Sequence, residues 1–255
     1  MTKDEVLKIL EFDTAQETIH GVIERMEHLL EFFKNEHAYK RLIPFLETYY
    51  IVTKTVLKKR MDPPHFYDKP DDLERLDVYF ASLYFQPLKK YIETGKSEPP
   101  WAGYFSYCEK DGIPFLQMLL GINTHINSDL CTSLIASGYS NRRDYLVINN
   151  ILDEVTPKIM RFLAFSAHDI FGLGGMIFRR LMEKEFYKTV VEWRQNAWDN
   201  ALTISTARNM DYQNKLFKCT EETCSRLINI FHELKIPMTI PKFNLKLENA
   251  LVRFK

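Results

Sequence analysis

Residues 114–130 read PFLQMLLGINTHINSDL, and this stretch decides the fold class that the rest of the chain must fit. Its apolar residues recur at three- and four-residue spacing, which is the period of an α-helix and not of a strand. A projection at about 100° per residue gathers one apolar face, formed by Phe115, Met118, Leu119, Ile122, Ile126 and Leu130. The spacing predicts a helix from Ile113 to about Ser133.

Two ionisable residues, His125 and Asp129, fall inside the arc of that apolar face. Side chains four residues apart on a helix lie one turn apart on the same surface, so imidazole and carboxylate can meet each other or a common third atom. A buried carboxylate without a partner is costly. We therefore expect a buried polar site on this helix.

The same helical period recurs through the chain, which only 9 Gly and 11 Pro interrupt among 255 residues. It predicts one all-α domain over residues 1–255, with an extended arm and a short amphipathic tail at 236–255. Thr14 and Glu17 have the spacing of a capping box for the first long helix, and residues 96–105 are expected to form a loop or a short turn. About seven long helices are predicted: 14–35, 44–60, 73–92 with a bend at Pro87, 113–133, 145–171, 176–205 and 211–234.

Composition excludes several classes of protein. The 34 Lys and Arg residues balance 34 Asp and Glu residues, so no global field attracts a nucleic acid. Four cysteines in so long a chain are too sparse for a disulfide framework. The chain starts without a secretory leader and has no run of about 18 apolar residues that could span a membrane. We expect a soluble, cytoplasmic protein.

Two further helices direct ionisable groups inward. In LERLDVYFASLYF, Asp77 projects among apolar residues, and in FYKTVVEWRQNAWDNALTI, Arg194 lies in an apolar seam between two tryptophans. These groups, with nearby amides and aromatic residues, form the predicted ligand pocket: Asp77, Tyr84, Asn123, His125, Asn127, Asp129, Arg194 and Trp198.

Two interpretations of this cluster fit the sequence. In one, His125, Asp129 and Asp77 bind a divalent metal such as Zn, Mn or Fe, whose water attacks an ester or phosphoester while Arg194 stabilises the developing negative charge. In the other, Arg194 pairs with Asp129 or Asp77, and the network fixes helix register and lines a ligand cavity. Buried polar networks are commoner than metal sites, which favours the second interpretation.

A second histidine–aspartate pair, His168 and Asp169, precedes the glycines at 172–175. Adjacent helical residues point about 100° apart. We therefore expect His168 to be a residue at a helix C-terminus rather than a metal ligand, and the glycines to form a hinge or a tight helix crossing. No G-x-S-x-G motif supports an acyl-enzyme mechanism.

The segments LDVYFASLYF and PFLQMLLGINTHINSDL, with LETYYIVTKTV, Trp101 and WRQNAWDNAL around them, resemble an uncharacterised family of helical proteins from bacteria and fungi. Its signature is roughly L-D-V-x-F-A-x-x-Y-F and N-A-H-I-N-x-D-L. The likeness covers most of residues 20–205. Thr124 replaces the usual alanine and Pro87 is a further departure. The resemblance implies an all-α fold and a shared site, but no reaction.

These observations favour a small-molecule-binding protein whose buried polar pocket takes a small apolar or amphipathic ligand. A metal-dependent hydrolase of esters or phosphoesters, using the H-x-x-x-D pair, is the alternative. A third class, a helical interaction protein, would bind a protein partner through the tail from Lys242 onward.

Overall fold

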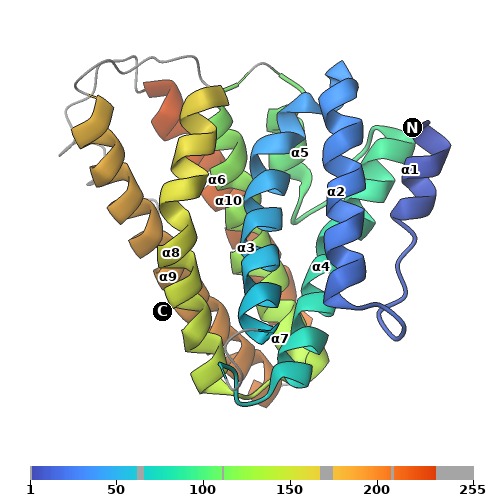
Figure 1. Ribbon diagram of the computed structural model, residues 1–255, viewed down its shortest axis with the longest axis vertical. Coiled ribbons are helices and arrows are strands. Elements are labelled where there is room, and N and C mark those ends of the chain that lie inside the picture. Colours follow the sequence, from blue (N-terminus) through green and yellow to red (C-terminus); the bar gives the residue numbers. More distant parts are fainter. Residues whose placement is uncertain (1, 62–65, 111, 167–174, 208–209, 234–255) are drawn as a thin grey trace.

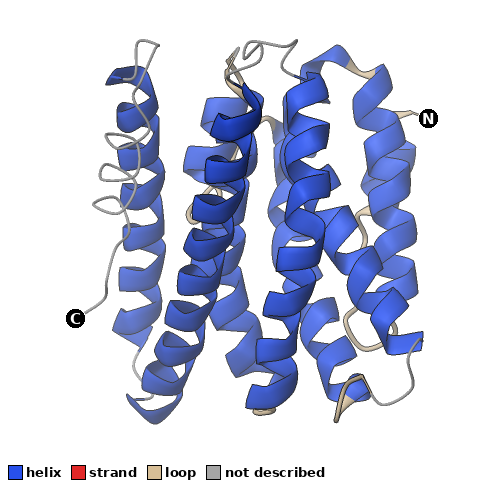
Figure 2. Cartoon of the chain, turned by 60° about the vertical axis from the view of Figure 1, so that its left-hand side comes forward, coloured by secondary structure: helices blue, strands red, loops and turns tan. Residues whose placement is uncertain are grey.

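The computed structural model describes residues 2–61, 66–110, 112–166, 175–207 and 210–233, and within these ranges every regular element is a helix (Figure 1). The long helices run roughly along the longest axis of a single domain (Figures 1 and 2). The prediction of an all-α domain is confirmed. In chain order the elements are α1 (Lys3–Ile9), α2 (Ile19–Asn35), the 3₁₀ helix η1 (His37–Leu42), α3 (Ile43–Met61), α4 (Pro70–Thr94), α5 (Ala102–Cys108), α6 (Pro114–Thr124), the π-helix η2 (His125–Leu130), α7 (Cys131–Ser137), α8 (Arg142–Ser166), α9 (Gly175–Ala207) and α10 (Met210–Glu233).

The first long helix, α2, starts later than the sequence predicted. Thr18 is its N-cap, and the Thr18 hydroxyl accepts a hydrogen bond from the Gly21 backbone N–H. The predicted capping box of Thr14 and Glu17 is therefore wrong, because a threonine next to the apolar stripe supplies the cap instead. The stripe itself is buried as predicted: Ile19, Val22, Ile23, Met26, Leu30 and Phe33.

Helices α3 and α4 form two walls around the centre of the domain. Helix α3 packs against α2, α6 and α8, and α4 packs against η2 and α7. Pro70 occupies the first turn of α4, where its missing N–H costs no helical hydrogen bond. The helix continues through Pro87 and ends at Gly95, whose φ of 69° is the left-handed conformation that glycine adopts without strain.

The helix predicted from 113 to 133 is continuous but not uniform. It consists of α6, η2 and α7, and the central six residues of it, HINSDL, are π-helical. Every residue from Leu116 to Leu134 is buried except Asn127 and Thr132, which are partly exposed. The predicted apolar face therefore included too few of the buried residues. This segment is the central helix of the domain, and it contacts neighbours on all sides.

The structure adds two short α-helices, α1 and α5, and the 3₁₀ helix η1 to the helices predicted. Helix α1, with a capping box between Thr2 and Glu5, packs against α2 and α4. Helix α5 starts inside the stretch predicted as a loop, directly after the buried Trp101. The predicted arm and tail at 236–255 and the pair His168 and Asp169 lie outside the described residues, so those expectations stay predictions.

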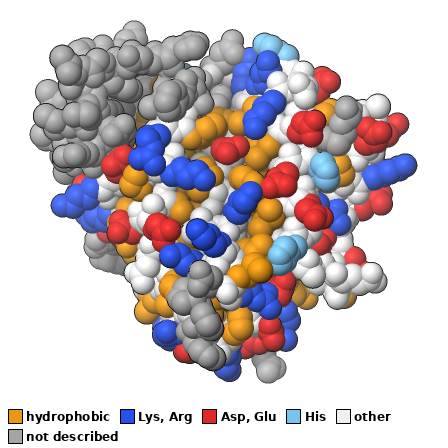
Figure 3. Space-filling model, viewed as in Figure 1, with side chains coloured by type: hydrophobic (Ala, Val, Ile, Leu, Met, Phe, Trp, Pro, Cys, Tyr) orange, Lys and Arg blue, Asp and Glu red, His pale blue; other side chains and the backbone are white. Residues whose placement is uncertain are grey.

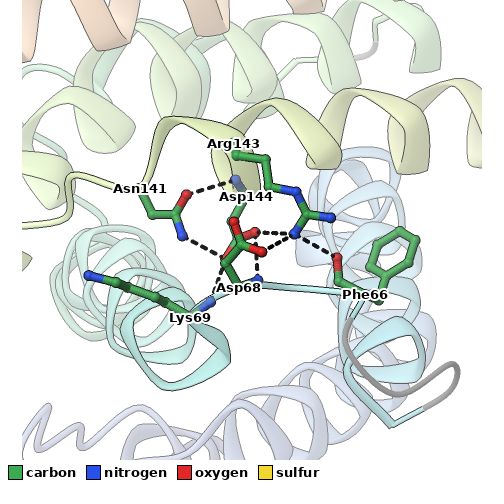
Figure 4. A network of polar contacts seen from close by, with 6 residues as sticks. All are labelled: Phe66, Asp68, Lys69, Asn141, Arg143 and Asp144. Carbon is green, nitrogen blue, oxygen red and sulfur yellow. Dashed lines mark hydrogen bonds and ion pairs between the residues drawn. The ribbon is translucent and has the colours of Figure 1, made fainter.

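A fully buried carboxylate connects the start of α8 to the segment before α4 (Figure 4). Asp144 accepts hydrogen bonds from the backbone N–H groups of Asp68 (2.9 Å) and Lys69 (2.7 Å) and from the Asn141 side chain (3.0 Å). Arg143 donates to Asp144 at 3.2 Å and to Asp68 at 2.7 Å. These bonds hold the N-terminal ends of α4 and α8 together, and both helices contribute to the site described below.

On the face shown in Figure 3, charges of one sign do not gather among the described residues. Basic and acidic side chains are interspersed on the face in Figure 3, in keeping with the equal numbers of each in the sequence. None of the helices in the described part of the chain is both long enough and apolar enough to cross a membrane.

Candidate functional site

The centre of the site is a contact between three side chains from two parts of the chain. In η2, His125 Nδ1 lies 2.9 Å from Asp129 Oδ2. The Trp101 indole N–H donates to the same Oδ2 at 3.1 Å. His125 and Asp129 are each 3% exposed and Trp101 is 1% exposed. The sequence prediction that the i,i+4 pair would share a buried face is confirmed in its geometry.

Aromatic rings hold the imidazole of His125 in one orientation. The Phe80 ring stacks on it at 3.5 Å between centroids and 10° between planes, and Tyr49 packs edge-on at 4.5 Å. Phe45 and Tyr84 contact it further out, at 5.6 and 6.2 Å. With Nδ1 directed at Asp129, the other ring nitrogen, Nε2, is buried and has no hydrogen-bond partner among the described residues.

Burial determines the protonation of the pair. It lowers the pKa of His125 well below its ordinary value and raises the pKa of Asp129 well above its own, an effect that the Trp101 hydrogen bond partly offsets. The imidazole is therefore neutral at neutral pH. A neutral imidazole has one N–H, so Nε2 accepts a hydrogen bond when that proton is on Nδ1, and donates one when Asp129 holds the bridging proton.

A cavity of about 90 Å³ opens next to His125, between α3, α4, η2, α8 and α9. Its wall is mainly apolar, and the sequence-predicted residues that line it are Asp77, His125 and Arg194. On the same measure one water needs about 10–15 Å³, so several waters or a small organic molecule would fit. An apolar cavity with a few convergent polar groups is the usual form of a small-molecule site.

Asp77, on α4, is the carboxyl group of this wall. Its Oδ2 atom is buried and has no hydrogen-bond partner among the described residues. Burial raises the pKa of Asp77 to about 7, although the positive charges of Arg194 and Arg60 act in the opposite direction. The group is therefore close to half-protonated at neutral pH.

Arg194, on α9, supplies the positive charge of the wall and is 7% exposed. Its Nε–H donates to Asn149 Oδ1 at 2.9 Å and its Nη2 donates to the Tyr145 carbonyl at 2.8 Å. The guanidinium also lies over the Tyr145 ring, 4.3 Å from the centroid, and the Tyr145 hydroxyl donates to the Arg194 carbonyl. No ion pair joins Arg194 to Asp77 or Asp129, so the predicted arginine–carboxylate pair is wrong: two neutral acceptors on α8 take these N–H groups instead.

The other predicted pocket residues lie away from the cavity. Asn127 donates to Asn123 at 2.9 Å, as a parallel i,i+4 pair, but Asn123 faces α10 and donates to the Thr220 carbonyl at 3.1 Å. Tyr84 lies on the far side of His125 and packs against Trp101. Trp198 packs against Tyr145 and the Arg142 guanidinium. None of these four side chains lines the cavity.

The predicted metal site finds no support in this geometry. Within the described ranges, no group of three His, Cys, Asp or Glu side chains is placed to hold a metal ion. His125 and Asp129 are instead hydrogen-bonded to each other, and no hydrogen bond joins Asp77 to either of them among the described residues. The prediction of joint ligation by His125, Asp129 and Asp77 is therefore not supported.

Sequence reasoning missed the partners that complete the site. It did not identify Trp101 as the donor to Asp129, nor Tyr145 and Asn149 as the acceptors that hold Arg194. Trp101 belongs to the family resemblance and directly follows two prolines, but neither signal indicates which carboxylate the indole meets. These contacts join residues far apart in sequence, and periodicity carries no information about them.

Fold and site together define an all-α protein with a mainly apolar cavity, lined by a few polar groups, at its central π-helix. The model of a family of unknown function, DUF5995, matches residues 19–232, and the chain therefore belongs to that family. The match includes every residue of the site and confirms the expected membership of an uncharacterised helical family. No curated protein and no solved structure matches the chain.

Proposed function

We propose that this protein binds a small molecule in the cavity next to His125. The proposal rests on two buried polar atoms, His125 Nε2 and Asp77 Oδ2, which have no hydrogen-bond partner among the described residues. Both residues line one apolar cavity. Leaving a buried polar group unsatisfied costs roughly 1–3 kcal/mol. A ligand that bonded to both atoms would recover that cost and bury apolar surface as well.

The rigidity of the wall supports the same proposal. Phe80 and Tyr49 restrain the imidazole, Asp129 directs its Nδ1, and Tyr145 restrains Arg194. Side chains that are already ordered lose little entropy when a ligand binds, so more of the contact energy appears as affinity. A network that only fixed helix register would not need a cavity beside it.

The alternative, a hydrolase, has one observation in its favour. An aspartate on Nδ1 of a buried histidine with a free Nε2 is the arrangement of a general base, and also of a single histidine metal ligand with its supporting carboxylate. Among the described residues this histidine belongs to no group of three His, Cys, Asp or Glu side chains that could hold a metal ion. Binding therefore explains more of the geometry than hydrolysis does.

Titration with small neutral probes tests the binding proposal. Indole and benzyl alcohol should bind the wild-type protein in isothermal titration calorimetry and raise its melting temperature. Val190→Phe, on the cavity wall, should abolish both effects by filling the space. Leu202→Phe, at a 56% exposed position on the same helix, is the matched control and should leave binding unchanged. Equal binding to both variants would place the probes outside the cavity and refute the proposal.

A further inference from the structure

The charges in the cavity wall specify the ligand further. Two charged residues line the cavity, Asp77 and Arg194, while the imidazole of His125 is neutral. Of the five guanidinium N–H groups of Arg194, one on Nε and one on Nη2 are used by Asn149 and Tyr145, both of which are neutral acceptors. No carboxylate of the described residues lies within ion-pair distance of this arginine. A buried cation without a counterion is costly and attracts an anion.

Asp77 offsets this charge only in part. Burial favours its neutral acid form, as the raised pKa of about 7 indicates. A neutral carboxyl group is a hydrogen-bond donor, whereas the ionised group only accepts. An anion in the cavity would favour the neutral form of Asp77 further, because two negative charges in one small apolar site repel each other.

The remainder of the wall is apolar and aromatic. Phe80, Ile126, Leu130, Ile148 and Val190 line the space between these polar groups. A ligand that fits must therefore combine an apolar body of a few carbon atoms with one charged end. Its body would replace water against this surface, while its charged end would reach the guanidinium.

We infer that the ligand is a small apolar monocarboxylic acid, and this inference rests on the proposed function. The carboxylate of the acid binds Arg194 and accepts a hydrogen bond from Asp77. The planar guanidinium matches a carboxylate with two parallel N–H donors, which is the geometry that favours arginine over lysine for this anion. His125 lines the same cavity, and its Nε2 atom has no hydrogen-bond partner among the described residues, so a polar substituent on the acid could bond to it.

Matched probes that differ only in their polar end test this assignment. Benzoate, benzyl alcohol and benzylamine have similar bodies and carry a negative, a neutral and a positive end. Calorimetric titration of the full chain at pH 6.5 should give benzoate a dissociation constant at least about tenfold below that of benzyl alcohol, the size expected for one charge-assisted bond. Benzylamine should bind most weakly.

Two variants make the result specific to the two wall residues. Arg194→Met keeps most of the apolar stem but loses the charge, and it should weaken benzoate by about tenfold or more while leaving benzyl alcohol unchanged. Asp77→Asn removes the negative charge and keeps a donor, so it should retain or tighten benzoate binding. Because Arg194 also holds α8, Asp77→Asn keeps the inference testable if Arg194→Met fails to fold.

The outcomes separate this inference from the proposed function. Equal affinity for benzoate and benzyl alcohol, with both blocked by Val190→Phe, would overturn the acid assignment and leave small-molecule binding intact. Tighter binding of benzylamine, with its loss in Asp77→Asn, would show instead that Asp77 recognises a cation. No binding of any of the three probes would contradict both the inference and the proposed function.

Discussion

At the scale of single residues, the site depends on polar atoms that the helix cannot satisfy by itself. Asp129 receives hydrogen bonds within a shell of aromatic rings, and Trp101 and His125 share one of its oxygens. Asp77 Oδ2, in contrast, has no hydrogen-bond partner among the described residues. The two carboxyl groups therefore differ in role: Asp129 positions the imidazole, and Asp77 is available to a ligand.

The raised pKa of Asp77 predicts a pH-dependent cost to stability. The folded state holds this proton more tightly than the unfolded chain, whose carboxyl has a pKa near 3.8, against about 7 when folded. The cost is therefore absent below about pH 4, grows as the pH rises between those two values, and reaches about 4 kcal/mol above pH 7. Asp77→Asn should remove it, so the variant should gain stability over wild type progressively from pH 4 to pH 8.

Urea unfolding at a series of pH values measures this difference. The exposed Asp153→Asn is the control, and its difference from wild type should stay constant across the same range. A difference for Asp77→Asn that did not change with pH would show that Asp77 is ionised in the fold at no cost.

At the scale of the element, the π-helix η2 places the site. Its six residues include both His125 and Asp129, and it packs against α9 and α4, which carry Arg194 and Asp77. A π segment inside an α-helix shifts the register of the side chains that follow it, and such segments are frequent at functional sites. Here it allows the central helix to bury side chains on every side while His125 meets the cavity.

The approach of α6 to α3 predicts the effect of a small substitution. Gly121 packs directly against the Phe45 ring, and a Cβ atom at this position would overlap that ring. Alanine normally stabilises a helix interior by about 1 kcal/mol relative to glycine. Gly121→Ala should instead destabilise the protein by roughly 1–3 kcal/mol, because the Phe45 ring, which packs against other aromatic rings, would have to shift to remove the overlap.

A second substitution tests whether the overlap with the Phe45 ring causes this loss of stability. Phe45→Leu removes the overlapping ring, so the double variant Phe45→Leu/Gly121→Ala should be more stable than the sum of the two single effects predicts. Chemical denaturation of all four proteins gives the coupling energy. Additive effects would mean that the ring does not limit the approach of the two helices.

At the scale of the whole molecule, the cavity exists because distant segments of the chain are held at fixed separations. The Asp144 network joins the segment before α4 to the start of α8 (Figure 4). Tyr145, the next residue along α8, holds Arg194 on α9. Three walls of the cavity are therefore connected through two adjacent residues of α8.

Loss of that connection should affect the entire domain. Asp144→Ala removes the acceptor for the backbone N–H groups of Asp68 and Lys69 and should cost roughly 3 kcal/mol or more. The half-exposed Asp72→Ala, which breaks surface pairs with Arg75 and Lys69, should change stability by about 0.5 kcal/mol or less. Equal losses for the two variants in urea denaturation would contradict the structural role of the Asp144 network.

The sequence by itself determined the all-α class, the extents of most long helices and the burial of His125 with Asp129. All three follow from the helical period, which is a local property that each segment carries independently of the others. The α-helical projection also placed Asp77 and Arg194 inward, as the cavity wall confirms. The sequence could not reveal the π-helical register of η2, because π-helical hydrogen bonding leaves no distinct residue pattern.

Only the tertiary structure decided which partners those inward groups meet. Arg194 bonds to Asn149 and Tyr145 rather than to a carboxylate, and the Trp101 indole N–H donates to Asp129. Each of these choices depends on how helices distant in sequence are spaced and rotated against one another. Helical periodicity indicates which face turns inward, but packing between helices sets the distances, and at hydrogen-bond range those distances decide the chemistry of the site.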